Sequence, residues 1–178
     1  MLGLTSLLSQ LDMLLELRPK AEAAMIDAAR RQSGWKTLRT IPFLGPVRVA
    51  YVLAILRTPW RFRTKRNLWP YAGLAVVKQS SANQEFKDGK LQRSRKAPMT
   101  RGLNRNHNPI LKAVFKGAAN AAVAKAGPLR DYYEASIARG VDDDLAKVTL
   151  ARKIAAVALR LWKKGEKFEA KKLTIQAT

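Results

Sequence analysis

Apolar residues recur every three or four positions over most of the chain, which predicts a mainly α-helical protein. The first stripe runs from Leu4 to Leu15 and predicts one face of a helix that kinks or ends at Pro19. A second helix then reaches about Arg31, so residues 1–33 are expected to form a helical arm. The leucine spacing suits a coiled-coil seam and packing on the rest of the chain equally well, and both alternatives stay open.

Proline and glycine divide the next stretch into helix, tight turn and helix. Gly45 closes the turn, and Pro46 suits the first position of the second helix. The order is similar to a helix-hairpin-helix, whose turn directs free backbone amides at a phosphate. The usual Pro-Gly-x-Gly pattern is here Pro42-Phe43-Leu44-Gly45, with phenylalanine in place of a glycine. An ordinary helix–helix corner is therefore the alternative interpretation.

The helical pattern fails between about residues 74 and 102, which predicts a short β-hairpin or irregular loop there. Residues 74–77 could form a strand, and Asp88-Gly89 is typical of a two-residue hairpin turn. This is the most polar and least regular part of the chain. On a rigid helical scaffold, such a segment is where a functional loop is expected.

The remainder of the chain predicts a helical bundle, with helices over about residues 108–125, 127–139 and 142–165. The three aspartates that open the last helix could hold a divalent metal, but a charged helix cap is the more common role. The predicted organisation is a helical arm over residues 1–33, a main domain over 34–170 that starts with the helix-hairpin-helix-like unit, and a tail over 171–178.

The charge of the chain indicates a polyanionic partner. Its 178 residues include 34 lysines and arginines against 13 aspartates and glutamates, a formal net charge of +21. A folded chain this basic repels itself unless polyanions neutralise it, so DNA or RNA is the expected partner. No apolar run reaches the ~20 residues that a membrane-spanning helix needs. We therefore expect a cytoplasmic protein with no membrane partner.

Several enzyme classes are disfavoured by missing residue types. The single histidine, His107, makes Ser-His-Asp hydrolysis and histidine-based metal sites improbable. The chain has no cysteine, which excludes disulfides and thiolate metal sites. It also lacks a Walker A sequence and a G-x-G-x-x-G motif, so neither an ATPase nor a dinucleotide enzyme is indicated.

Lysine and arginine concentrate in two stretches, residues 57–66 and 87–105. The first interleaves its cations with Trp60 and Phe62, which could stack on bases. We expect instead that both rings face the core while the cations point outward. The residues predicted to contact nucleic acid are Gly45, Arg48, Arg61, Arg63, Lys65, Arg66, Lys78, Lys87, Lys90, Arg93, Arg95, Lys96, Arg101 and Arg105.

Several motifs occur in an order that resembles a known transposase domain. They are IP-x-x-GP at 41–46, RFRTKRNLW-x-YAGL at 61–74, RGLNRNHN at 101–108, FKGAA at 115–119, GPLR at 127–130 and LARKIAA at 150–156. Together they are similar to the C-terminal domain of the IS-one-ten family of insertion-sequence transposases, which use a bridge RNA. The resemblance extends from about residue 38 to residue 168.

The resemblance implies a serine nucleophile eight residues after the glycine of the Ala-Gly-Leu motif. Counting from Gly73 leads to Ser81, with Ser80 as the alternate, and Ala82 stands where the family usually has glycine. The implied reaction is DNA recombination and transposition through a phosphoserine intermediate, which conserves the bond energy and needs no ATP. An ordinary loop serine is the alternative interpretation of the same residue.

Family members also carry an N-terminal RuvC-like domain whose four carboxylates bind divalent metal. Because this chain begins in the helical arm, we expect a truncated or split form that holds no cofactor itself, with Mg²⁺ only in the missing domain. The implied partners are DNA, a guide (bridge) RNA, and a second copy of the chain through the arm. The alternative function is a non-catalytic basic module that binds DNA or RNA.

Overall fold

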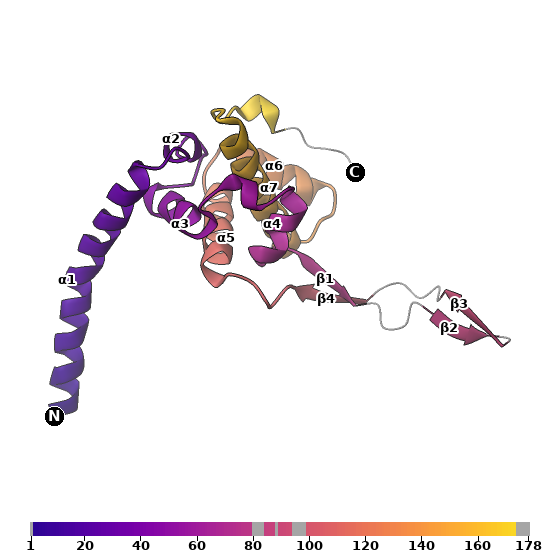
Figure 1. Ribbon diagram of the computed structural model, residues 1–178, viewed down its shortest axis with the longest axis horizontal. Helices are drawn as coiled ribbons and strands as arrows, with labels where there is room; N and C mark the ends of the chain where they lie inside the picture. The colour runs from indigo at the N-terminus through magenta and orange to yellow at the C-terminus, as the bar shows by residue number, and fades with distance from the viewer. Residues whose placement is uncertain (1, 80–83, 88, 94–98, 174–178) are drawn as a thin grey trace.

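Helices dominate the described part of the chain, which comprises residues 2–79, 84–87, 89–93 and 99–173 of a computed structural model. This confirms the predicted mainly α fold class (Figure 1). The helices are α1 (Leu2–Arg30), α2 (Trp35–Leu38), α3 (Pro46–Leu56), α4 (Lys65–Tyr71), α5 (Pro109–Val123), α6 (Pro128–Ala138) and α7 (Asp143–Lys164), with short 3-10 helices η1 (Pro59–Arg61) and η2 (Ala170–Lys172).

The arm is one continuous helix that projects from the helical body (Figure 1). α1 does not end at Pro19, so the predicted second helix is wrong. Proline removes one backbone donor and crowds the carbonyl of Leu15, four residues earlier. Leu15 is exposed, and water can therefore satisfy the carbonyl that loses its partner. Only the end of α1 packs on the body, where Met25 and Ala29 join the core.

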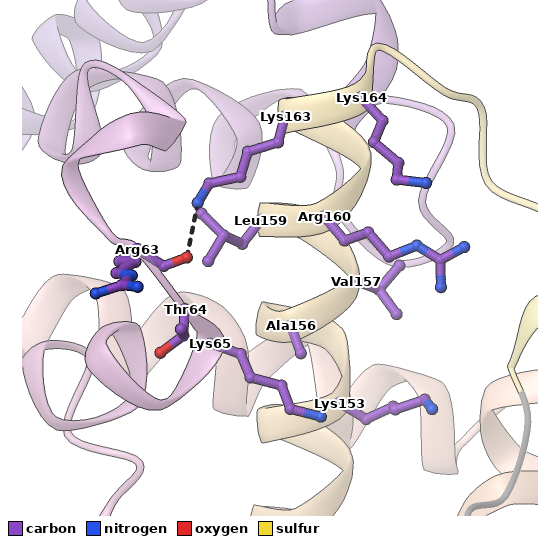
Figure 2. A pocket seen from close by; sticks show the side chains of 10 residues that line it. All are labelled: Arg63, Thr64, Lys65, Lys153, Ala156, Val157, Leu159, Arg160, Lys163 and Lys164. Atoms are coloured by element: carbon purple, nitrogen blue, oxygen red, sulfur yellow. Dashed lines mark hydrogen bonds between the residues drawn. The ribbon is translucent and has the colours of Figure 1, made fainter.

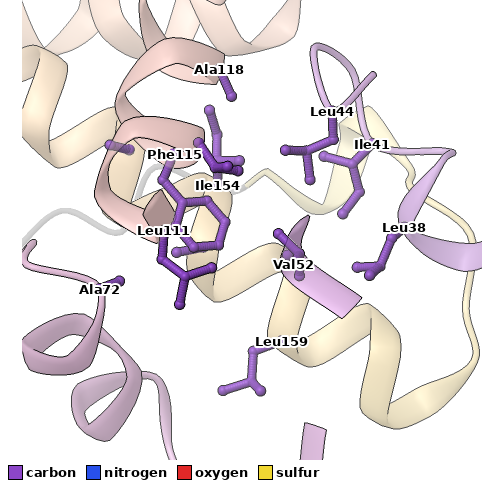
Figure 3. Packing of buried hydrophobic residues seen from close by; sticks show 14 of the residues in the cluster. Leu38, Ile41, Leu44, Val52, Ala72, Leu111, Phe115, Ala118, Ile154 and Leu159 are labelled. Atoms are coloured by element: carbon purple, nitrogen blue, oxygen red, sulfur yellow. The ribbon is translucent and has the colours of Figure 1, made fainter. Parts of the chain in front are cut away.

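The core lies where α3, α5 and α7 meet, and α2 extends it (Figure 3). Phe115 and Leu111 of α5 and Ile154 of α7 are fully buried. Small side chains let α5 and α7 approach closely. The fully buried alanines at this contact are Ala118, Ala119, Ala122, Ala151 and Ala155.

α4 ends at a glycine in the left-handed backbone conformation. Gly73 has φ +66°, and its amide donates to the carbonyl of Pro70. The Leu74 amide donates to the carbonyl of Trp69, which completes the hydrogen-bond pattern of a glycine-ended helix. A Cβ atom at position 73 would also lie 2.5 Å from the ring of His107. Gly73 is thus required by its backbone conformation and by close packing.

Two short antiparallel β-ribbons interrupt the helices. β1 (Val76–Gln79) pairs with β4 (Met99–Leu103), and β2 (Gln84–Lys87) pairs with β3 (Lys90–Arg93). The partners Lys87 and Lys90 confirm the hairpin predicted from Asp-Gly, and Gly89 has φ +72°. The pairing of β1 with β4 was not predicted, because no local turn joins them. The ribbons and α1 extend from opposite sides of the body in Figure 1.

The three C-terminal helices begin and end close to the predicted residues. The Asn108 side chain accepts a hydrogen bond from the Leu111 amide at 3.0 Å, so it caps α5. Asp142 caps α7 by accepting from the Asp144 amide, and Gly165 ends that helix with φ +67°. The predicted boundaries of the arm, main domain and tail remain a prediction.

Candidate nucleic-acid interface

The segment after α3 directs its two aromatic side chains in opposite directions. Phe62 is buried, as predicted, whereas Trp60 is 70% exposed and the prediction that it faces the core is wrong. Trp60 lies in η1, where each residue turns by about 120°, so side chains two positions apart cannot share a face. Thr58 begins this turn, and its hydroxyl accepts a weak 3.4 Å hydrogen bond from the Trp60 amide.

Aromatic contacts hold the buried half of this segment against α4. The rings of Phe62 and Tyr71 lie 5.3 Å apart between centroids. The guanidinium of Arg61 lies 4.6 Å from the Tyr71 centroid and donates a hydrogen bond to the Ile55 carbonyl at 3.3 Å. Arg61 therefore covers the aromatic pair and joins it to the end of α3.

Lys163 of α7 fixes the same segment from the other side. Its Nζ donates to the carbonyl of Phe62 at 2.6 Å. It also donates to the carbonyl of Arg63 at 3.1 Å, as Figure 2 shows. The ammonium also lies 5.3 Å from the centroid of the Trp60 ring. One lysine thus determines where the backbone at 62–63 runs relative to α7.

A basic groove lies between this segment and α7. Its cavity volume is about 400 Å³, and Figure 2 shows the side chains of its walls. Six of its ten lining residues are cations and none is acidic. The lining residues are Arg63, Thr64, Lys65, Lys153, Ala156, Val157, Leu159, Arg160, Lys163 and Lys164.

The cations of the basic groove act on one another electrostatically. Burial lowers the pKa of the Lys153 ammonium, and the charges of Lys65 and Arg160 lower it further. In Figure 2 the Lys65 side chain extends toward the base of Lys153, whose ammonium points away from it. Holding these charges together is unfavourable until an anion neutralises them. The groove therefore has the chemistry of a phosphate-binding surface.

The base of β1 is anchored to the same helix. Arg152 of α7 donates from Nε to the carbonyl of Leu74, and its guanidinium lies 5.9 Å from the Trp69 centroid. The indole of Trp69 donates in return to the carbonyl of Arg152 at 3.2 Å. Burial lowers the pKa of this guanidinium. α7 thus supports both the basic groove and the strand that leads toward residues 80–81.

At the predicted helix-hairpin-helix turn, the backbone conformation of Phe43 is the one that the glycine of the usual pattern would adopt easily. Phe43, which stands where the pattern has a glycine, adopts φ +65°, a conformation that favours glycine. Its carbonyl accepts from Arg48 at 2.8 Å, and the Leu44 carbonyl accepts from Arg39 at 3.1 Å. Gly45 is the N-cap of α3 and has an extended backbone. Binding of phosphate by Gly45 and Arg48 stays a prediction.

Apart from Arg48, the predicted cations fall into three groups. Arg63 and Lys65 meet on the basic groove, whereas Arg61 covers the aromatic pair and Arg66 is exposed on α4. A second group is distributed along the ribbons and the loop that follows them: Lys78, Lys87, Lys90, Arg93, Arg101 and Arg105. The third group, Arg95 and Lys96, lies outside the described residues, as do Ser80 and Ser81.

Four cations of the groove were missed by the sequence analysis, and all four lie on α7. Lys153, Arg160, Lys163 and Lys164 follow a spacing of seven, three and one, so they share one side of the helix. That pattern is visible in the sequence beside the apolar stripe. Which segment faces it is not visible, because residues 63–65 reach it only through the tertiary fold.

The aspartates that open α7 contribute to a cap and a local ion pair. Asp143 accepts from the Tyr133 hydroxyl and from Lys147, each at 2.7 Å. These donors, Lys147 first, lower the pKa of the Asp143 carboxyl. Within the described ranges, no three histidine, aspartate or glutamate side chains are placed to hold a metal ion together.

Comparison with known families decides the assignment. Residues 35–134, more than half of the chain, match the family described as Transposase IS116/IS110/IS902 family. The chain belongs to this transposase family. The match begins at α2 and ends within α6. One wall of the basic groove in this transposase, residues 63–65, therefore lies inside the matched region, whereas the other wall, α7, lies beyond it. No curated protein matches the chain. In the part of the chain that is described, no helix is long and apolar enough to span a bilayer.

Proposed function

We propose that this transposase binds DNA through the basic groove and transfers DNA strands through a serine ester. The observation that carries the binding proposal is a concave surface where six cations converge from two separate segments, with no acid among the described residues that line it. Ala156, Val157 and Leu159 supply the apolar part of its lining. Such a surface is complementary to a phosphate backbone and reads no sequence by itself.

Phosphate contacts make binding strongly dependent on salt. Each neutralised phosphate releases counterions, so the logarithm of the association constant falls linearly with the logarithm of the salt concentration. Removing one contact lowers that slope by about 1 for duplex DNA. The slope therefore counts how many groove cations touch the strand.

The binding test compares Lys65→Ala and Arg160→Ala with Lys125→Ala, an exposed lysine just after α5 that does not line the basic groove. Fluorescence anisotropy with a labelled DNA duplex is measured over a series of salt concentrations. We expect each groove variant to weaken binding and to reduce the salt slope by about 1, and the Lys125 variant to change neither as much. Equal effects of all three variants would contradict binding in the groove.

The catalytic part of the proposal assigns the nucleophile to Ser81. The support is its position eight residues after Gly73, whose φ of +66° ends α4, and the strand β1 that runs toward it. The serine Oγ would attack phosphorus as the bond to a sugar oxygen breaks. The serine proton would end on the released sugar hydroxyl, so the phosphodiester becomes a phosphoserine ester.

The catalytic test uses Ser81→Ala, with Ser80→Ala as the matched neighbour. Each variant is expressed with a full-length family member whose own serine is substituted, and recombined DNA and covalent protein–DNA adducts are measured. Loss of both products with Ser81→Ala but not with Ser80→Ala is expected. Unchanged adduct formation by Ser81→Ala would assign the nucleophile elsewhere.

The second candidate function is a basic module that binds DNA or RNA without catalysis. The basic groove supports this second function as well as it supports the transposase reaction, because binding in the groove needs no serine. In that case, Ser81→Ala leaves binding and its salt dependence unchanged, and no covalent adduct forms with the unsubstituted chain. A guide RNA as partner would be shown by RNA retained on the purified chain and displaced by salt.

A further inference from the structure

Beside the basic groove lies the exposed aromatic ring of Trp60, which is not part of the hydrophobic core. Trp60 is 70% exposed although Phe62, two residues later, is buried. Lys163 lies 5.3 Å from its centroid, and Thr58 fixes the turn that carries it. The ring is therefore presented to solvent on a positioned backbone, next to a cation.

A second cavity of about 420 Å³ opens next to this ring. Its walls include Trp60, Trp162, Arg57 and the polar side chains of Gln32 and Thr37, and no acidic residue lines it among those described. Amide and hydroxyl groups can exchange hydrogen bonds with the edge of a base. The second cavity thus combines an aromatic surface with hydrogen-bonding groups and positive charge.

Both cavities share Lys163 and Lys164. The two cavities therefore adjoin at these lysines, and a strand whose phosphates lie in the basic groove can extend into the second cavity. The two halves of a nucleotide then have complementary surfaces side by side: cations for the phosphate and an indole face for the base. This arrangement of aromatic and basic groups is characteristic of proteins that bind single strands.

We infer that Trp60 stacks on an unpaired nucleobase, and that this part of the molecule takes single-stranded nucleic acid rather than intact duplex. In a duplex each base is covered by its neighbours, so no base face can reach the indole. An unpaired nucleotide of DNA or of RNA has a free face. The inference rests on the proposed binding of phosphates in the basic groove and adds the state of the strand that is bound.

The test compares Trp60→Ala, Trp60→Phe and the unsubstituted full chain on single strands of equal length that differ in their bases or in their sugars. The probes are a labelled oligothymidylate, an oligouridylate, and an abasic sugar–phosphate strand of the same length. Trp60→Ala should weaken binding of a base-containing strand by roughly 5- to 150-fold, the range for loss of one base–aromatic stack. Trp60→Phe should recover part of that loss, and binding of the abasic strand should not depend on residue 60.

Equal affinity of Trp60→Ala and the unsubstituted chain for the oligothymidylate and the oligouridylate would overturn the inference. Equal loss on base-containing and abasic strands would also overturn it, because the ring would then act only by placing Lys163. A loss on one of the two base-containing strands alone identifies DNA or RNA as the ligand. Groove variants such as Arg160→Ala should weaken binding of the abasic strand as well, so failure of the groove and failure of the stack give different results.

Discussion

α1 and α7 are the two long helices of this transposase, and their leucine patterns are similar although their environments differ. Both carry apolar residues at intervals of three and four. On α7, Leu150, Ile154 and Leu161 are buried against α5 and neighbouring elements. On α1, every leucine from Leu4 to Leu17 is between 48% and 68% exposed.

The difference shows that an apolar stripe predicts a helix but not what covers it. α7 has neighbours on both sides of its stripe, and its remaining surface carries the cations of the basic groove. α1 meets the body only near Met25 and Ala29, and the stripe on its first turns meets nothing within the described chain. The same pattern therefore stabilises the fold in α7 and leaves an exposed apolar surface on α1, of the kind that marks an interaction site.

The largest difference is expected from truncating one apolar residue on each helix. Ile154→Ala should lower the free energy of unfolding by about 2–5 kcal/mol, because it leaves a cavity in the core. Leu11→Ala, at an exposed position, should change it by less than about 0.5 kcal/mol in the monomer. Denaturant titration at low protein concentration measures both. Equal losses would mean that the arm packs on the body in solution.

The next effect concerns the hydrogen bonds that Lys163 of α7 donates to the segment before α4. Lys163→Met leaves the carbonyls of Phe62 and Arg63 without their charged donor and should cost about 1–3 kcal/mol of unfolding free energy. Lys164→Met is the matched control, since Lys164 is exposed and pairs only loosely with Glu166 at 3.6 Å. Similar stability of the two variants would show that Lys163 does not hold the segment.

A moderate effect is expected from charging the exposed stripe of α1, which we propose is covered by a second copy of the chain. Leu7→Lys should weaken self-association by about tenfold, because one buried leucine is worth about 1.5 kcal/mol. Ser9→Lys places the same charge nearly on the opposite face and should have little effect. Sedimentation over a range of concentrations measures the association. A monomer at all concentrations would exclude this pairing.

The smallest effect concerns the lowered pKa of Lys153. A lysine whose folded pKa lies below its unfolded pKa destabilises the fold while it is charged, and that cost disappears as pH rises from the folded to the unfolded value. Lys153→Met should therefore be slightly more stable than the unsubstituted chain at neutral pH, and this advantage should shrink in alkaline solution. The same variant should bind DNA more weakly. Thermal unfolding at several pH values checks the sign, and an advantage that grows with pH would contradict it.

Much of the fold could be predicted because its signals are local. Asn108, Gly73 and Gly165 act on backbone groups within a few residues, so their caps can be recognised without knowledge of the tertiary structure. The same holds for the hairpin at Gly89. Pro19 is the exception: its local effect is to disfavour a helix, yet the exposed arm accommodates it.

The candidate site could be predicted only in part. Arg63 and Lys65 were expected to contact nucleic acid and do line the basic groove, but Trp60 was expected in the core. The orientation of that ring depends on the 3-10 turn at Pro59–Arg61 and on where Phe62 finds space beside Tyr71. Neither is determined by the spacing of aromatic residues.

By itself, the sequence determined the helical class, the helix caps, the excess of positive charge and the transposase family, because each follows from residue types and short-range order. Only the tertiary structure decided which cations converge and which apolar faces are covered. Lys153 and Lys65 are far apart along the chain, and they become neighbours because α7 packs against α4. Their mutual repulsion is the physical result of that packing, and it gives the groove its capacity to hold an anion.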